Sequence, residues 1–491
     1  FWIPPFPCFQ RLKAATTWAQ HADKNNHDSA LEAYETSVEL LPQQALTLKS
    51  TIGLATDAAA CASRLNEIGK AVEFLEAGRS VFWSQALQLH TSLDDLEAVH
   101  PELAERIRNI SKELEVGSHR AVSSIRILPA VDKAHMMLDK DDQQGFEGFL
   151  RPKLMNELKA AAINGPIIVL NASRSSCTAF IVTLSRDVQS VNLENLTWDR
   201  AQLLVDLLRA LLSQNDVDSP TLTKIQGREA STGIPTPQER LEGTIETLQD
   251  HTPNEDLDDC VSDYVVSSYT HTLTTLLNPP SHTASPFKMM AVIQPTTANC
   301  SNLPATVEEL ARIKQQVPSQ WLTSLGDATP ATVDIALSHL QESSVVHFAC
   351  HGIQDIQNPL ESGLLLTDGR LKVSELMRGK SQKKSMTLAF LSACETAKGD
   401  DTVPDEAMHL AATLLFAGFR GVVATMWTMA DLDGPKIAET FYQHLFKGCN
   451  TNTDPPDLTK AAECLHNAVA KLRADTNVPF SRWVPFVHYG F

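Results

Sequence analysis

The chain has 491 residues, of which 43% are hydrophobic and 20% charged; this composition is typical of a globular protein with two or three domains. Its 59 acidic residues outnumber its 41 basic ones and give a formal net charge of −18. Such a surface repels nucleic-acid phosphates and attracts basic peptides, so we expect no nucleic-acid partner.

Nine scattered cysteines, none in a CxxC pair, argue against a disulfide framework and against a zinc site, and favour a reducing, cytoplasmic location. No apolar stretch reaches the roughly 18 residues that span a bilayer, so we expect no membrane association. We expect no cofactor. No signal peptide is visible at the start, but the chain begins at Phe1 and not at a methionine, so its start carries no information about targeting.

Residues 1–125 are predicted to be helical. Helices at 11–23 and 29–41 fit the tetratricopeptide template at Trp18, Ala22, Ala30, Tyr34, Val38 and Pro42. In a second pair, at 46–68 and 69–89, the small residues Ala55, Ala59 and Ala62 share one helix face. They would allow close approach to Ala71, Leu75 and Gly78. The sequence favours a repeat-like helical domain, and a plain helical bundle is the alternative.

Connecting helices are predicted over 126–164, and a second domain over 165–491. Strands at 166–171, 177–184 and 188–193 predict a meander, followed by an amphipathic helix at 198–212. The stretch 213–260 is polar and poor in periodicity, which predicts a flexible insertion or the trace of a deletion.

From residue 287 strands and helices alternate regularly, which predicts βαβ units and a mainly parallel sheet covered by helices on both faces. The predicted strands are 289–294, 344–349, 386–393, 421–427 and 483–490, with a hairpin at 363–366 and 370–373. The predicted helices are 306–316, 332–341, 406–416, 436–446 and 458–474. Thr306 and Glu309 have the spacing of a capping box at the start of the first of these helices.

Two of these strands end in residues that carry chemistry. One delivers His351 followed by Gly352, and the other delivers Cys394. If the strands are neighbours, the imidazole can activate the thiol and then protonate a leaving amine, and the backbone N–H of Gly352 can help bind an oxyanion. The pattern predicts a thiol-protease dyad.

Other interpretations of these segments are weaker. Cys350 adjoins His351, but consecutive strand residues point to opposite faces, so Cys350 cannot easily pair with its neighbour His351. His347 and His351 share a face, yet the segment offers no third ligand, so we expect no metal. Ser392 shares the face of Cys394 one step deeper and is interpreted as support. The remaining alternative is that His351 and Cys394 are ordinary buried residues.

The sequences HFACHG at 347–352 and LSACET at 391–396 resemble the signature of CHAT-domain proteins. These are cysteine peptidases of the caspase–separase clan, often fused to tetratricopeptide repeats. The likeness extends to 418–431 and to the last strand, and covers residues 165–491. It implies an α/β caspase–haemoglobinase-like fold and an endopeptidase that acts in proteolytic signalling or cell death, with an activating partner on the N-terminal helices.

By the same resemblance, His351 is the general base, Cys394 the nucleophile, and the backbone N–H groups of Gly352 and Cys394 form the oxyanion hole. Separases bind a basic P1 side chain through an acid after the strand that follows the catalytic cysteine, which makes Asp431 and Asp433 candidates for substrate binding. Each has the alternative role of capping the helix that begins near Gly434.

The chain departs from the family pattern in one place. CHAT sequences usually carry a Pro-x-Gly-x-Leu-x-x-x-Pro-like run before the stretch that matches 263–277, and no such run occurs between 213 and 262. The departure predicts that a supporting strand and its turn are lost. It favours a rival interpretation, a catalytically silent pseudoprotease that serves as a protein-interaction scaffold. A thiol acyltransferase would use the same dyad but has no supporting motif.

Overall fold

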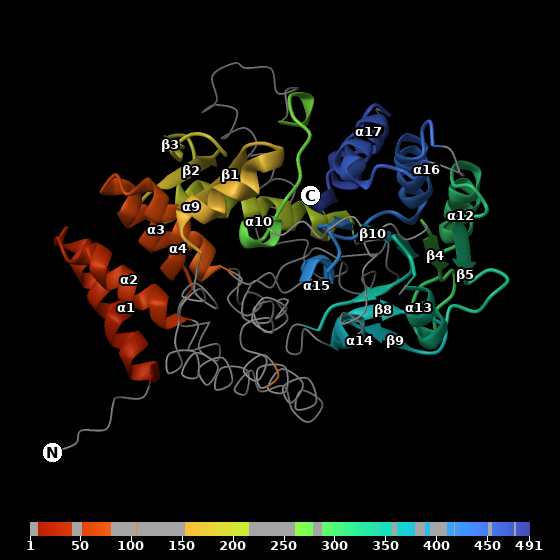
Figure 1. The fold of residues 1–491 in the computed structure, drawn as a ribbon, viewed down its shortest axis with the longest axis horizontal. Helices are drawn as coiled ribbons and strands as arrows, with labels where there is room; N and C mark the ends of the chain where they lie inside the picture. The colour runs from red at the N-terminus through yellow and green to blue at the C-terminus, as the bar shows by residue number, and fades with distance from the viewer. Residues whose placement is uncertain are drawn as a thin grey trace, which may run out of the picture.

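The computed structural model describes residues 8–41, 52–79, 105, 153–215, 261–277, 287–340, 342–355, 361–378, 388–392, 410–416, 418–449, 454–475 and 478–491. The first helices lie at one end of the molecule and the largest sheet at the other (Figure 1). The predicted connecting helices between 126 and 152, and the polar stretch 216–260, fall outside these ranges. Within them, no helix is both long and apolar enough to cross a membrane.

Four helices form two hairpins at the N-terminal end. Helix α1 (Cys8–Lys24) packs on α2 (Ala30–Leu40), α3 (Leu54–Arg64) packs on α4 (Ile68–Gly78), and α2 contacts α3. The four predicted helices are confirmed over the described residues. Helix α4 ends at Gly78, and residues 80–89 of the predicted 69–89, like the rest of the predicted helical stretch up to 125 apart from residue 105, lie outside the described residues. Helix α3 begins at Leu54 and ends at Arg64, inside the predicted 46–68, and Asn66 beyond its end adopts a left-handed φ of 63°.

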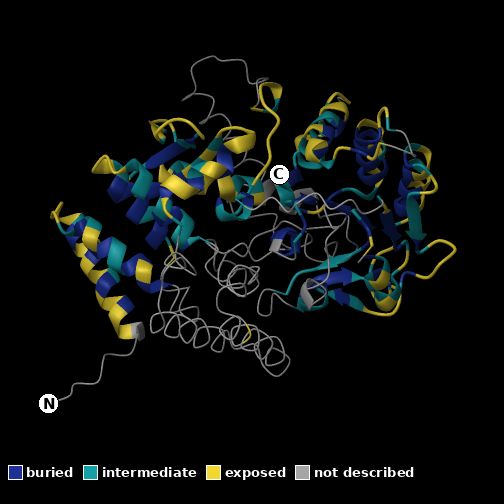
Figure 2. Cartoon of the chain, in the orientation of Figure 1, coloured by how far each residue is buried: buried dark blue, intermediate teal, exposed yellow. Residues whose placement is uncertain are grey.

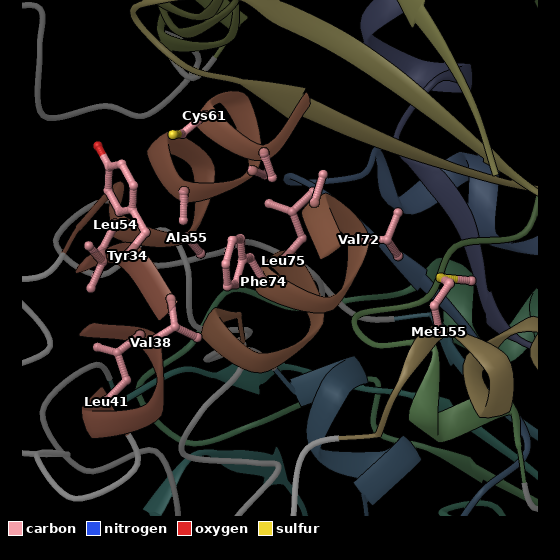
Figure 3. Close-up of a cluster of buried hydrophobic side chains, with 14 of the residues drawn as sticks. Tyr34, Val38, Leu41, Leu54, Ala55, Cys61, Val72, Phe74, Leu75 and Met155 are labelled. Carbon is pink, nitrogen blue, oxygen red and sulfur yellow. The ribbon is translucent and has the colours of Figure 1, made fainter. Parts of the chain in front are cut away.

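The small residues pack as the sequence predicts. Ala55, Ala59 and Ala62 are all buried, and a Cβ added to Gly78 would lie 2.5 Å from the Cβ of Ala55. The helices therefore approach so closely at this point that only glycine fits. Figure 3 shows the core that results, with Tyr34 on one hairpin and Leu75 on the other.

The predicted meander is confirmed and lies against these helices. Strands β1 (Ile167–Ala172), β2 (Cys177–Val182) and β3 (Gln189–Asn192) pair antiparallel in that order, and α10 (Trp198–Asn215) follows. Phe180 and Val182 of β2 belong to the same buried cluster as the helices. The side chain of Asn171 donates a hydrogen bond to the carbonyl of Thr56 at 3.0 Å. The meander thus shares its core with the helical region.

The main sheet has six strands in the order β12-β11-β10-β6-β4-β5. These are β4 (Met289–Ile293), β5 (Leu322–Leu325), β6 (Val345–Ala349), β10 (Leu388–Ser392), β11 (Gly421–Thr425) and β12 (Phe486–Gly490). All neighbours are parallel except β12, which runs antiparallel to β11. A three-stranded sheet of β7 (Gly352–Ile353), β8 (Gly363–Leu365) and β9 (Arg370–Lys372) contains the predicted hairpin.

Helices cover both faces of this sheet, so its central strands β4, β6, β10 and β11 are buried (dark blue in Figure 2), whereas most of the edge strand β5 is only partly buried. Helices α12 (Ala305–Gln316), α16 (Gly434–Leu445) and α17 (Ala461–Arg473) lie on one face. The other face carries α13 (Val333–Leu340), α14 (Val373–Arg378) and α15 (Leu410–Phe416). The predicted architecture, a mainly parallel sheet sandwiched by helices and preceded by a helical region, is confirmed.

Residues 261–277 join the two ends of the molecule. The backbone N–H of Tyr269 donates to the carbonyl of His488 at 2.8 Å, and that of Gly490 donates to the carbonyl of Tyr269 at 2.8 Å, which extends the main sheet beyond β12. A few residues on, the carboxylate of Glu76 in α4 accepts from the backbone N–H groups of Leu273 and Thr274 at 2.7 and 2.9 Å and from the Thr274 hydroxyl at 2.6 Å.

Replacing Glu76 by alanine should therefore destabilise the fold. Three donors would lose their common acceptor, and we expect a loss of about 2–4 kcal/mol in the free energy of unfolding, measured by urea denaturation. Glu67→Ala on the exposed start of the same helix is the matched control. An equal, small effect in both variants would contradict the role assigned to Glu76.

Two histidines are buried where this segment meets β12. Burial lowers the pKa of His488 to about 4 and that of His271 to about 4. The Ser268 hydroxyl lies 2.8 Å from Nδ1 of His488, and the ring of His271 stacks on Tyr489 with centroids 4.9 Å apart. Both sites therefore favour the neutral imidazole.

We predict that the protein loses stability as the pH falls from about 6.5 toward 4. In this window the unfolded chain binds protons at both histidines and the folded chain does not, so each costs on the order of 1 kcal/mol at pH ~5.5. Glu76 acts in the opposite direction, because burial raises its pKa. Denaturation curves of His488→Gln should show a smaller loss than those of wild type, while His21→Gln, at an exposed site, should match wild type.

Candidate active site

The two strands that carry the predicted dyad are direct neighbours. Strand β6 pairs with β10 in parallel, with His347 opposite Phe390 and Ala349 opposite Ser392. His351 follows Ala349 by two residues, and Cys394 follows Ser392 by two. Cys394 itself lies outside the described residues. The predicted dyad requires that the two strands be neighbours, and β6 and β10 are neighbours in the sheet.

His351 stands at the end of β6 and is half-buried. Its Nε2 lies 2.7 Å from the carbonyl oxygen of Ser301, and its own carbonyl accepts from the N–H of Leu365 at 2.8 Å. A carbonyl oxygen can only accept, so Nε2 carries the hydrogen, and Nδ1 is the nitrogen available as a base. Gly352 follows directly as the first residue of β7 and lies opposite Leu364.

The faces of β6 separate the other candidates as expected. Cys350 is fully buried in the apolar cluster with α13 and α15, on the face away from His347. Nδ1 of His347 lies 3.0 Å from the hydroxyl of Tyr442 in α16. Among the described residues, no three His, Cys, Asp or Glu side chains are grouped to hold a metal ion.

Glu309 is a residue whose role the sequence reasoning missed. The predicted capping box is wrong, because α12 begins at Ala305 and the Thr306 hydroxyl donates to the carbonyl of Leu303. Glu309 instead turns inward and is 2% exposed. One carboxylate oxygen accepts from the Ser392 hydroxyl at 3.1 Å. The sequence contains a signal for this burial, because Glu309 falls on the same helix face as Thr306 and Ile313.

The two aspartates after β11 have partners within the chain. Asp433 is fully buried, and both of its oxygens accept from the guanidinium of Arg482, at 2.7 and 2.5 Å. These hydrogen bonds raise the pKa of Arg482. Asp433 occupies the N-cap position of α16 but makes no capping bond. Asp431 is partly exposed and accepts from the N–H of Ala305 at 3.0 Å, so it caps α12. Arg482 already neutralises Asp433, which leaves Asp431 the more available acid.

Residues 246–491, half of the chain, match the CHAT domain family. No curated protein matches the chain. Among solved structures, the Arg-specific cysteine proteinase gingipain R (RgpB) of Porphyromonas gingivalis is 11% identical, with a TM-score of 0.32, over 45% of this chain and 51% of its own.

A secreted C11 cysteine protease from Bacteroides thetaiotaomicron is 14% identical, with a TM-score of 0.27, over 40% of this chain and 63% of its own. In the separase–securin complex of Saccharomyces cerevisiae, the matching chain is 11% identical, with a TM-score of 0.46, over 94% of this chain and 37% of its own. Each alignment covers less than two thirds of the other protein. The main sheet with its covering helices is the mainly parallel, helix-sandwiched architecture that the resemblance to this family predicts.

Proposed function

The chain belongs to the CHAT domain family, and from this premise we propose that it is a cysteine endopeptidase with Cys394 as nucleophile and His351 as general base. The observation that carries the proposal is the register of β6 and β10. Ala349 and Ser392 lie opposite each other, and the same two-residue step leads from each to a candidate catalytic residue. Ala349 and Ser392, from which the two steps begin, lie on the face that holds α12 and α16.

Chain connectivity limits how far apart the two candidates can lie. Two peptide steps limit the Cα of Cys394 to about 7.6 Å from that of Ser392, and the Cα of His351 to the same distance from that of Ala349. Neighbouring strands lie about 4.8 Å apart. A hydrogen bond between the thiol and the imidazole is compatible with these limits.

The proposed reaction follows from the tautomer of His351. The Ser301 carbonyl holds Nε2–H, so Nδ1 takes the thiol proton. The thiolate attacks the peptide carbonyl, and the oxyanion is bound by the backbone N–H groups of Gly352 and Cys394. The imidazolium then protonates the leaving amine as the C–N bond breaks, and water hydrolyses the thioester to regenerate the thiol.

Replacing Cys394 or His351 by alanine should each reduce cleavage of a peptide library by at least about a thousand-fold, because the dyad acts as a unit. Covalent labelling by an acyloxymethyl ketone should be lost in parallel. Cys449→Ala and His21→Ala, at sites away from the dyad, are the matched controls. Retained cleavage in either dyad variant would overturn the assignment. A wild-type protein that neither cleaves nor labels would favour the pseudoprotease scaffold.

We further propose that Asp431 contributes to a pocket for a basic P1 side chain. Its partial exposure and its place after β11 support this, and the net charge of −18 favours basic substrates. Asp431→Asn keeps an oxygen for the N–H of Ala305 but removes the charge. We expect kcat/KM for substrates with P1 arginine to fall about ten-fold or more relative to uncharged P1. Asp327→Asn, on an exposed turn, should leave this ratio unchanged, and an unchanged ratio in Asp431→Asn would exclude the pocket.

Regulation through the helical region completes the proposal. Residues 268–274 link Glu76 to β12, which neighbours β11 and then β10, so a partner bound to the N-terminal helices acts on the same sheet that carries the dyad. We propose signalling or cell-death proteolysis in a reducing, cytoplasmic setting, where the described cysteines stay free. The Glu76→Ala protein tests the link, because a cleavage rate equal to that of wild type would argue against it.

A further inference from the structure

Four buried polar side chains meet on the face of β6 and β10 that α12 and α16 cover. Each comes from a different element: Glu309 from α12, His347 from β6, Ser392 from β10 and Tyr442 from α16. They are 2%, 0%, 6% and 0% exposed, respectively. The proposed reaction uses none of them.

Glu309 lies at the centre of this cluster and contacts both strands of the dyad. One of its oxygens accepts from Ser392, two residues before Cys394. The other lies 3.1 Å from Nε2 of His347, four residues before His351, close enough for an ion pair but not aligned as a hydrogen bond. One carboxylate thus spans β6 and β10 at diagonal positions, since His347 pairs with Phe390 and Ser392 with Ala349.

The remaining contacts hold His347 in place. Its Nδ1 lies 3.0 Å from the Tyr442 hydroxyl, and its ring stacks on Phe390 of β10 with centroids 4.8 Å apart. Burial, with a smaller contribution from the charge of Glu309, raises the pKa of Tyr442 well above its usual value, so the phenol keeps its proton. The imidazole can therefore turn neither away from Glu309 nor out of the sheet.

The absence of a side chain at Gly434 makes room for the Glu309 carboxylate. A Cβ added to Gly434 would lie 2.7 Å from a Glu309 oxygen and 3.0 Å from the Ser392 hydroxyl. Burying an acid is unfavourable, and apolar residues in place of the whole cluster would pack here with no polar group to satisfy. Stability alone therefore does not account for an acid at this position.

We propose that Glu309 is a positioning residue that fixes the ends of β6 and β10 through His347 and Ser392, and so sets the distance between imidazole and thiol. This inference rests on the proposed function for the identity of the dyad. It assigns Glu309 no contact with substrate. If it holds, disturbing Glu309 or Ser392 changes turnover and the titration of the thiol, while substrate binding stays the same.

The test compares Ser392→Ala, Glu309→Leu and Glu309→Gln with Glu308→Gln, the exposed neighbour on the same helix. We expect Ser392→Ala and Glu309→Leu to lower kcat about ten-fold with KM within two-fold. Glu309→Gln should retain at least a third of kcat, because its amide oxygen still accepts from Ser392. Glu308→Gln should match wild type. In the Ser392→Ala/Glu309→Gln double variant kcat should fall by less than the product of the two single effects, since the two residues share one contact.

A second measurement needs no turnover. The rate at which iodoacetamide alkylates Cys394, followed by mass spectrometry across pH, gives the thiol titration in every variant. We expect Ser392→Ala to shift this profile and to slow alkylation at neutral pH at least three-fold, and Glu308→Gln to leave it unchanged. Thermal midpoints identify any variant that fails to fold; if Glu309→Leu does, Ser392→Ala decides.

The outcomes separate the two proposals. Unchanged kcat and an unchanged alkylation profile in folded Ser392→Ala would overturn the positioning role and leave the dyad intact. An alkylation profile that does not respond to His351→Ala would overturn the dyad. A shifted profile in Ser392→Ala would then still show that this cluster positions the thiol.

Discussion

The parallel pairing of β6 with β10 in one register is the constraint on which the candidate site depends. His347 lies opposite Phe390 and Ala349 opposite Ser392. Side chains alternate along a strand, so a shift of the pairing between β6 and β10 by one residue would turn Ser392 to the opposite face of the sheet. It would also place Cys350 beside different residues of the neighbouring strand. Any chemistry that combines residues beyond both strand ends therefore requires this register.

Packing on both faces fixes the register more firmly than the hydrogen bonds between the strands. Val346 and Phe348 enter the cluster under α13 and α15, whereas Val345 and Phe390 enter the cluster under α16 and α17. A shifted strand would bury its residues in the wrong cluster and leave cavities, which cost several kcal/mol per large side chain. The contacts of Glu309 with Ser392 and His347 also favour this alignment of the strands, because they form in only one register.

Periodicity explains which parts of this structure could be predicted. The continuous apolar strands and the ten-residue helices between them identify a covered parallel sheet, and the faces of Cys350 and His347 follow from alternation alone. The pairing of Tyr269 with β12 and the ion pair of Asp433 with Arg482 could not be predicted, because each joins residues far apart in the chain without any repeating pattern.

Glu309 shows a different limit of sequence reasoning. Its spacing from Thr306 matches a capping box, a local pattern that competes with the buried stripe of the same helix. The acid found its partners on β6 and β10, elements that tertiary structure alone brings near α12. Where a local motif and a buried position compete for one residue, the position within the core decides.

The two ends of the parallel strands differ in the kind of residues that they bury. At the N-terminal ends of β4 and β5 the rings of Phe287, Trp321 and Phe446 pack together, with ring centroids no more than 6.1 Å apart. At or just beyond the opposite ends of the parallel strands lie the buried polar residues Gln294, Ser392, Thr425 and Asp433, with Glu309 beside them. Apolar packing stabilises one edge at little cost, whereas buried polar groups destabilise the other unless each is paired. The carboxyl edge is the edge where parallel sheets place their sites, so the position of these buried polar groups is consistent with the site proposed there.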